Sequence, residues 1–365
     1  MISIAKPIIG EDEKRAVCSV LDSGMIAQGP KVKEFEEFFA KFIGTKYAIA
    51  TSAGTTALCT ALHSLGIKSS DEVITTSFTF IATANSILDC GAKPVFADID
   101  PKTFNIDPAK ITQKITSKTK ALLIVHLFGQ PCDMQPILDI CKKHNLKLVE
   151  DCCQAHGAEY KGQKVGTFGD CGIFSFYPTK NMTTCEGGII TTNDEKLMEA
   201  CKLYRDHGSK VKYSHETIGF NFRMTDVYAA IGLVQLKKLN GFNKKRIENA
   251  AKMTNNLKNI KGIVTPHVAQ DVLHVFNQYT LKIKPELGIA RNAVMEKLKL
   301  AGIGSSIYYP IPIHKQPLYQ KLGYADVLPE TEKVAQEVLS VPIHPSLSEQ
   351  DIDAIASALA NLNKN

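Results

Sequence analysis

The sequence predicts an α/β protein with two domains, a large one built on a mainly parallel sheet and a smaller C-terminal one. Strand and helix patterns alternate through the first two-thirds of the chain, as they do in βαβ units. The pattern changes after about Asn240, so we expect a large domain over residues 1–240 and a small α/β domain over 241–365. The length of 365 residues also exceeds what one hydrophobic core usually fills.

The expected elements follow one another closely. Apolar residues recur at helical spacing between Val32 and Ile43, which indicates an amphipathic helix. Further on, we expect strands over residues 47–50, 72–75, 94–97, 121–126 and 147–150, and helices over residues 55–65, 79–88 and 134–144. In the small domain we expect a long charged helix over residues 241–257, a strand over 278–283, a helix over 291–301, a proline-rich loop over 308–317 and two closing helices.

The composition excludes several classes of protein. With 44% hydrophobic and 22% charged residues, the chain is too apolar for a disordered protein and too charged for a membrane protein. The net charge of +6 suits a phosphate-bearing ligand, but the plainer interpretation is a slightly basic soluble protein. No run of Lys and Arg suggests a nucleic-acid groove. Because we find no secretory leader and the apolar run over residues 121–125 is too short to span a bilayer, we expect a cytoplasmic protein.

The ten cysteines include the adjacent Cys152 and Cys153 but no Cys-x-x-Cys pair. We therefore expect reduced, mostly buried thiols, without a disulfide framework and without a metal site. The sequence also lacks Gly-x-Gly-x-x-Gly, a phosphate-binding loop ending in Gly-Lys-Ser/Thr, and His-Glu-x-x-His. Nucleotide-dependent redox chemistry, ATP chemistry and metalloprotease chemistry therefore lack their usual motifs.

Three segments that follow predicted strands are candidates for chemistry, because ligands of open α/β sheets bind at the carboxyl ends of the strands. Residues 51–56 are small and polar and precede a helix, so they form either a phosphate cradle or a helix cap. Asp151 follows a strand and is a ligand, a catalytic group or a helix cap. Lys180 lies between an aromatic strand and a Thr/Gly-rich turn, so it is either a solvated lysine or an amine nucleophile with a lowered pKa.

Six segments, in this order along the chain, together resemble the DegT/StrS family of sugar-nucleotide aminotransferases. These enzymes use pyridoxal phosphate and have the fold-type I architecture, a large domain with a mainly parallel sheet and a smaller C-terminal α/β domain. The resemblance runs essentially from Pro7 to Leu362. It rests on residues 54–58, 77–85, 150–158, 175–188, 219–224 and 308–314.

The resemblance implies roles for individual residues. Lys180 is expected to form the Schiff base with the cofactor aldehyde, and Asp151 to pair with the pyridine nitrogen, which keeps the ring an electron sink. Gln154 is expected near the phenolic oxygen of the ring, and Phe80 on the ring face. The remaining implied residues contact the phosphate, with the last reaching it from a neighbouring subunit: Gly54, Thr55, Thr56, Ser175 and Asn221.

The implied activity is transfer of an amino group from glutamate to a nucleotide-linked keto sugar, by a homodimer with shared active sites. Such a reaction would serve amino-sugar and surface-glycan biosynthesis. One alternative is a sugar dehydratase with the same cofactor, although such relatives carry histidine in place of Lys180. Another is a non-catalytic regulator on the same fold. The sequence leaves open the keto sugar, which could be 4-keto-6-deoxy or 3-keto/N-acetylated, and also the nucleotide.

The proline-rich loop, which we follow as far as Tyr319, has two interpretations. Its prolines restrict the backbone, so the loop can present side chains at low entropy cost. By composition alone it is a connector whose tyrosines pack on the small domain. The resemblance instead implies that Tyr308, Tyr309 and His314 contact the nucleotide and sugar over the cofactor, with His314 or Lys315 meeting diphosphate oxygens.

Overall fold

The computed structural model describes residues 1–362, and a seven-stranded sheet forms its centre. The strands are β1 (Tyr47–Thr51), β2 (Glu72–Thr76), β3 (Lys93–Ala97), β4 (Thr119–Val125), β5 (Lys147–Asp151), β8 (Cys171–Ser175) and β9 (Gly188–Thr192). They stand in the order β1-β9-β8-β5-β4-β2-β3. The run from β8 to β3 is parallel, whereas β9 is antiparallel to both of its neighbours. The predicted mainly parallel sheet is thus confirmed.

Helices cover both faces of this sheet. One face packs against α3 (Gly54–Ser64), α4 (Ala82–Asp89) and α7 (Glu195–Arg205); the other packs against α2 (Pro30–Ile43), α5 (Pro108–Thr112), α6 (Met134–His144) and the first half of α8 (Asp226–Leu257). Successive residues of a strand point to opposite faces. Ala121 and Leu123 of β4 therefore join the core under α3, while Leu122 and Ile124 join the core under α6.

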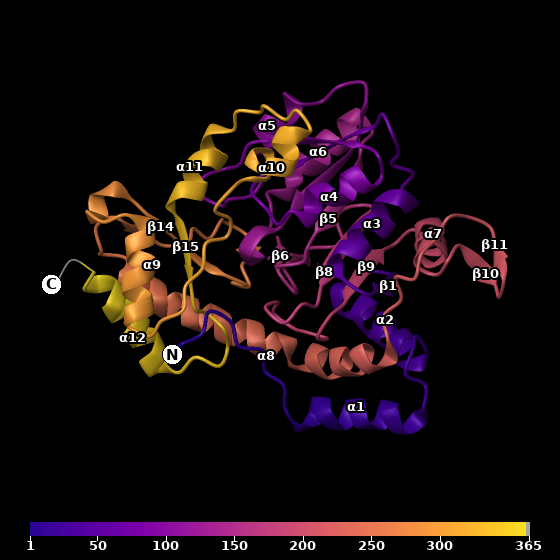
Figure 1. The fold of residues 1–365 in the computed structure, drawn as a ribbon, viewed down its shortest axis with the longest axis horizontal. Coiled ribbons are helices and arrows are strands. Elements are labelled where there is room, and N and C mark those ends of the chain that lie inside the picture. Colours follow the sequence, from indigo (N-terminus) through magenta and orange to yellow (C-terminus); the bar gives the residue numbers. More distant parts are fainter. Residues whose placement is uncertain (363–365) are drawn as a thin grey trace.

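The C-terminal part packs around the second half of α8. Its sheet consists of β12 (Ile263–Val264), β14 (Tyr279–Ile283) and β15 (Val338–Val341), and its helices include α9 (Arg291–Leu300) and α12 (Glu349–Ala360). Met253 and Leu257 of α8 are fully buried in this core. Figure 1 shows α8 running beneath both parts of the molecule. The division at residue 240 stays a proposal, because α8 crosses that point without a break.

Some expected elements need correction. α8 begins at Asp226, where the Thr225 hydroxyl accepts a hydrogen bond from the Tyr228 N–H, and not at residue 241. The charged residues from which a helix start at residue 241 was predicted begin where α8 leaves the core of the large sheet. They therefore mark a change in the burial of α8 and not its first turn. Sequence reading also missed α1 (Glu11–Ser23) and β15, and the loop over residues 308–317 contains a short 3-10 turn, Ile313–Lys315. No helix within residues 1–362 is long and apolar enough to cross a membrane.

Candidate active site

A cavity of about 710 Å³ opens at the carboxyl ends of the central strands. Its walls come from the turns after β1, β2 and β5 and from the ends of β4 and β8, as expected for an open α/β sheet. The C-terminal part contributes Asn277, Gln278, Tyr308 and Tyr309 to the same cavity. The predicted site residues that line it are Gly54, Thr55, Phe80, Asp151, Gln154, Ser175, Lys180, Tyr308 and Tyr309.

The start of α3 forms an anion cradle at one end of the cavity. A helix leaves its first backbone N–H groups without partners, and its dipole favours negative charge at that end. Gly54 is required for the close approach of this helix to β8, since a Cβ at Gly54 would lie 2.7 Å from the Cβ of Ser175. The Thr56 hydroxyl hydrogen-bonds to the Ala53 backbone instead, so Thr56 shapes the turn and does not line the cavity.

Asp151 is a buried carboxylate with a fixed orientation. It ends β5 and is only 5% exposed. Its Oδ2 accepts a hydrogen bond from the Thr83 hydroxyl at 3.0 Å, and its Oδ1 accepts one from the Cys153 N–H at 3.1 Å. No helix begins directly after Asp151. The carboxylate therefore serves the cavity rather than a helix cap.

Lys180 lies in the turn after β8, where it is half-buried. Its backbone N–H donates to the Tyr177 carbonyl at 2.9 Å. The next residue anchors the turn, because the Asn181 amide donates to Asn243 Oδ1 at 2.8 Å and to the Val275 carbonyl at 3.0 Å. Within the described chain no hydrogen bond or ion pair engages the Lys180 Nζ. The turn thus holds Lys180 at the cavity, and its side-chain amine has no partner among the described residues.

Gln154 and the aromatic residues complete the wall. The Gln154 side-chain carbonyl accepts from the Phe128 N–H at 2.8 Å, and its amide donates to the Tyr309 hydroxyl at 3.1 Å. Burial raises the pKa of Tyr309, so this phenol stays protonated at neutral pH. Phe80 remains about half exposed, with its ring centroid 6.4 Å from that of Tyr309. Its ring face is therefore available to a planar ligand.

Besides Thr56, two predicted site residues lie outside the cavity lining. His314, which is expected to meet substrate, is fully buried and does not line the cavity. Its Nδ1 is 2.6 Å from the Ser77 hydroxyl and its Nε2 is 3.1 Å from Glu332 Oε1, so both ring nitrogens are engaged. Asn221 is exposed and lies outside the cavity of its own chain.

Sequence reasoning missed other groups around this site. His156 is fully buried, and its ring packs against the rings of Phe174 and Phe176. Burial lowers the pKa of His156 to about 3, and the positive charge of Lys180 contributes to this shift. Thr83, which orients Asp151, was also missed. His156 lies within residues 150–158, one of the segments on which the family resemblance rests. Its position therefore indicated a functional role, but nothing in the sequence pattern predicted that the side chain is buried.

One buried cluster has the composition of a metal site but not its hydrogen bonding. Suitable ligand atoms of His126, Glu150 and Cys152 lie within 4.8 Å of one another. However, His126 Nδ1 accepts from the Cys132 N–H, which leaves its Nε2 to donate to Glu150 Oε2 at 3.1 Å. The Glu150 carboxylate also accepts backbone N–H groups from Gly166, Phe168 and Gly169. A fully hydrogen-bonded network of this kind supports β5 from behind the site.

The cavity as a whole fits pyridoxal phosphate. It has an anion cradle that a Cβ at Gly54 would disturb, an oriented carboxylate, an aromatic face and an unpaired amine. The cradle matches the phosphate of the cofactor, and the carboxylate matches its pyridine nitrogen. The aromatic face matches its planar ring, and the amine matches its aldehyde. Gly54, Thr55 and Ser175 would hold the phosphate, Asp151 the ring nitrogen and Lys180 the aldehyde.

Comparison with known proteins extends this likeness to nearly the whole chain. Residues 7–360 match the DegT/DnrJ/EryC1/StrS aminotransferase family. Similar proteins include the "Pleiotropic regulatory protein" of Geobacillus stearothermophilus, which is 43% identical over 95% of this chain and 93% of its own length. The GDP-perosamine synthase of Caulobacter vibrioides is 42% identical over 98% of this chain and 97% of its own length.

A third relative and a solved structure bear on the chemistry. The dTDP-3-amino-3,6-dideoxy-alpha-D-galactopyranose transaminase of Aneurinibacillus thermoaerophilus is 41% identical over 95% of this chain and 94% of its own length. The crystal structure of NtdA from Bacillus subtilis, with the bound cofactor PMP, matches with a TM-score of 0.90 and 35% identity. That match covers 98% of this chain and 83% of NtdA. The predicted resemblance and cofactor class are confirmed.

Proposed function

This chain belongs to the DegT/DnrJ/EryC1/StrS aminotransferase family, and from that premise we propose that it moves the amino group of glutamate onto the ketone of a nucleotide-linked sugar. It is an aminotransferase that uses pyridoxal phosphate. The observation that carries the proposal is the meeting of Lys180 and Asp151 in one cavity with an anion cradle. The presence of Lys180 and an oriented Asp151 also favours an aminotransferase over a dehydratase or a regulator.

Each residue has a separate task in this proposal. When bound, pyridoxal phosphate supplies an aldehyde for the donor's nitrogen and a ring that withdraws electrons. Asp151 holds the proton on the pyridine nitrogen, since its carboxylate is already oriented by Thr83. Lys180 Nζ acts as the general base that takes the proton from the donor's α carbon. The same amine serves both halves of the reaction, and two sequential half-reactions imply ping-pong kinetics.

The acceptor proposal rests on the cavity and on the relatives. A cavity of about 710 Å³ has the size of a small-molecule site and exceeds what a cofactor alone requires. Two relatives are named for products with GDP and dTDP, so the nucleotide differs within the family. The names support a nucleotide-linked sugar as the class of acceptor here, for the synthesis of an amino sugar. Glutamate as the donor rests on the family resemblance.

We also propose a homodimer with shared active sites. The described lining of the cavity contains one cation, Lys180, and two carboxylates, Asp151 and Glu186, whereas a nucleotide diphosphate is strongly anionic. A second copy would supply the missing polar groups, Asn221 among them. The segment over residues 209–221 begins with the hairpin of β10 (Ser209–Val211) and β11 (Ser214–His215), which projects from the molecule (Figure 1), and ends at Asn221, which pairs with Asp206. Its exposed apolar side chains include Val211, Tyr213, Ile218 and Phe220.

The experiment that tests this function is a panel of nucleotide keto sugars, each incubated with the holoenzyme and glutamate labelled with ¹⁵N. We expect mass spectrometry to find ¹⁵N in the amino sugar formed from at least one acceptor. A panel that includes 4-keto-6-deoxy and 3-keto N-acetylated sugars, linked to UDP, GDP and dTDP, should also identify the acceptor. No labelled sugar from any acceptor, with cofactor bound, would contradict the proposal. The cytoplasmic location remains a prediction.

A further inference from the structure

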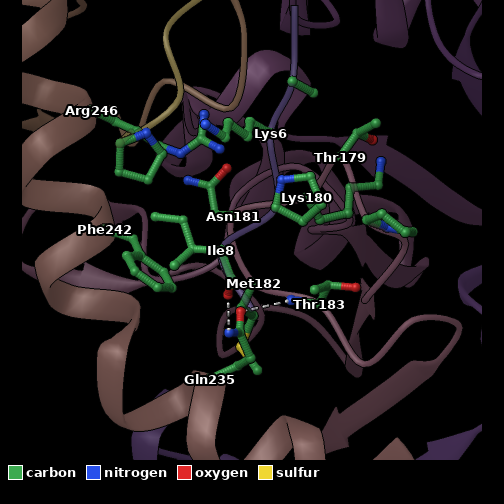
Figure 2. A pocket seen from close by; sticks show the side chains of 14 residues that line it. Lys6, Ile8, Thr179, Lys180, Asn181, Met182, Thr183, Gln235, Phe242 and Arg246 are labelled. Atoms are coloured by element: carbon green, nitrogen blue, oxygen red, sulfur yellow. Dashed lines mark hydrogen bonds between the residues drawn. The ribbon is translucent and has the colours of Figure 1, made fainter. Parts of the chain in front are cut away.

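A second, much smaller pocket adjoins the turn that carries Lys180. The N-terminal segment over residues 5–8, the turn over residues 178–183, three residues of α8 and Pro345 enclose it (Figure 2). It contains about 20 Å³ of free space. That volume accepts one water-sized particle but no sugar, nucleotide or amino acid.

Arg246 of α8 lines this pocket without a matching negative charge. Its side chain is 6% exposed. Its Nη1 donates to the carbonyls of Phe276 and Asn277 at 3.2 and 3.3 Å, while its Nε is buried and has no partner. No carboxylate of residues 1–362 forms an ion pair with it. Burial lowers the pKa of Arg246 to about 10, which reflects the cost of this uncompensated charge.

Lys6, an exposed residue of the N-terminal segment, and Lys180 add two further positive charges to the lining of this pocket. Arg246, Lys6 and Asn181 gather at one end of it in Figure 2. Burial lowers the pKa of the neighbouring His344, and the charges of Arg246 and Lys6 add to this shift, so Arg246 and Lys6 lie in the same region. No Asp or Glu belongs to the described lining. The interior of the pocket is therefore electropositive.

The other polar side chains of the pocket are already committed. Asn181 donates to Asn243 and Val275 and accepts from Asn277. Gln235 donates to the Ile8 carbonyl and to Glu13, and its carbonyl accepts from the Thr183 N–H. The charged donors that remain without a protein partner in the described residues therefore belong to Arg246, Lys6 and Lys180, and Lys180 is the residue assigned to the cofactor.

We propose that this pocket binds a small monatomic anion, chloride in the cell, between Arg246 and Lys6. Such an anion fits the free space and supplies the counter-charge that buried Arg246 lacks. It also joins the N-terminal segment to α8, because Lys6 and Arg246 lie on these two elements. Binding should stabilise the folded enzyme, since a ligand of the native state shifts the unfolding equilibrium. This inference is independent of the sugar substrate.

A crystallographic test uses bromide, which scatters anomalously. In crystals of the holoenzyme soaked in sodium bromide, we expect an anomalous peak within hydrogen-bond reach of Arg246 and Lys6. Water alone in the pocket, in crystals that carry bromide at other surface positions, would overturn the proposal.

A solution test compares two single lysine variants in the holoenzyme. Lys6→Met removes one of the cations that line the pocket, whereas Lys244→Met removes an exposed lysine of α8 outside it. With chloride exchanged for gluconate at constant ionic strength, we expect Lys6→Met to weaken the chloride-dependent rise in melting temperature, with an apparent affinity about tenfold lower. Lys244→Met should titrate like the wild type. Equal responses of the two variants, or no chloride effect in the wild type, would refute the site.

Discussion

Asp151 is oriented by its own neighbours, so its charge should matter for rate more than for folding. Replacing Asp151 with Asn keeps the shape but removes the charge that holds the proton on the pyridine nitrogen. We expect the α-proton abstraction from glutamate to slow by about 10²–10³-fold or more, measured in a single-turnover half-reaction. The variant should still bind the cofactor. A variant with the wild-type rate, or one that unfolds without cofactor, would assign Asp151 a structural role.

Gly54 gives a separate test of the phosphate cradle. A Cβ at this position would lie 2.7 Å from Ser175 Cβ and 3.2 Å from Cys153 Sγ, so α3 and β8 would have to move apart. We expect Gly54→Ala to weaken the binding of pyridoxal phosphate about tenfold, on the scale of one lost charge-assisted hydrogen bond. Titration of the apoenzyme with cofactor measures this, and circular dichroism checks the fold. Unchanged affinity would mean that the phosphate lies elsewhere.

At the residue level, strand ends could be located from the sequence, but side-chain directions could not. Asp151 ends β5 and Lys180 follows β8, and both line the cavity because the carboxyl ends of these strands face it. His314 carries the same resemblance but packs against Ser77 and Glu332, which are distant in sequence. Thr56 points back to its own turn. Only tertiary contacts decide such cases.

At the level of elements, α8 contains two glycines whose replacement by alanine should have opposite effects on stability. A Cβ at Gly232 would lie 2.8 Å from a ring carbon of Phe35, whereas a Cβ at Gly241 would meet nothing within 4 Å. Alanine is favoured over glycine inside a helix by about 1 kcal/mol. Gly241→Ala should therefore raise the melting temperature, while Gly232→Ala should lower it, because overpacking outweighs the helix propensity.

Differential scanning fluorimetry of the two variants checks this prediction. If both glycine variants were stabilised, the tight contact of α8 with α2 would be absent.

The same helix shows why boundaries were harder to predict than elements. The helical period is unbroken from Asp226 to Leu257, but the first half is buried under the main sheet and the second half is more charged. A change in burial therefore resembled a helix start. The antiparallel direction of β9 was also invisible, since strand direction follows from connections and not from composition.

At the scale of the whole molecule, buried histidines should make stability depend on pH. Burial lowers the pKa of His274 to about 3, while the unfolded chain protonates this side chain near the ordinary histidine pKa of 6.5. Between those values the unfolded state binds more protons, so stability falls as the pH falls. The titration of His274 alone should lower the free energy of unfolding by about 2 kcal/mol between about pH 7 and about pH 5.

The variant His274→Gln lacks this titration. Its stability relative to the wild type, measured by urea unfolding, should therefore improve as the pH is lowered over that range. A constant difference between the two proteins would contradict a neutral, buried His274.

The proposed dimer predicts complementation between inactive subunits. If Asn221 serves the partner's cofactor, a mixed dimer of Asn221→Ala and Lys180→Ala subunits contains one intact site. After mixing and subunit exchange, statistical pairing makes about half of the dimers mixed, and each mixed dimer has one intact site of two. Activity should then rise to at most about a quarter of the wild-type activity. Activity that stays at the level of the separate variants, despite exchange shown by labelled subunits, would place Asn221 in its own chain's site or in none.

The central claim is that Lys180 holds the cofactor and passes nitrogen from a donor to a sugar, and one spectroscopic measurement tests it most directly. The visible absorbance of the resting holoenzyme should disappear on addition of glutamate alone and return on addition of the nucleotide keto sugar. Lys180→Ala should bind cofactor without that resting band and show neither change. A wild-type band that ignores both substrates, or a Lys180→Ala variant that completes the cycle, would contradict the account.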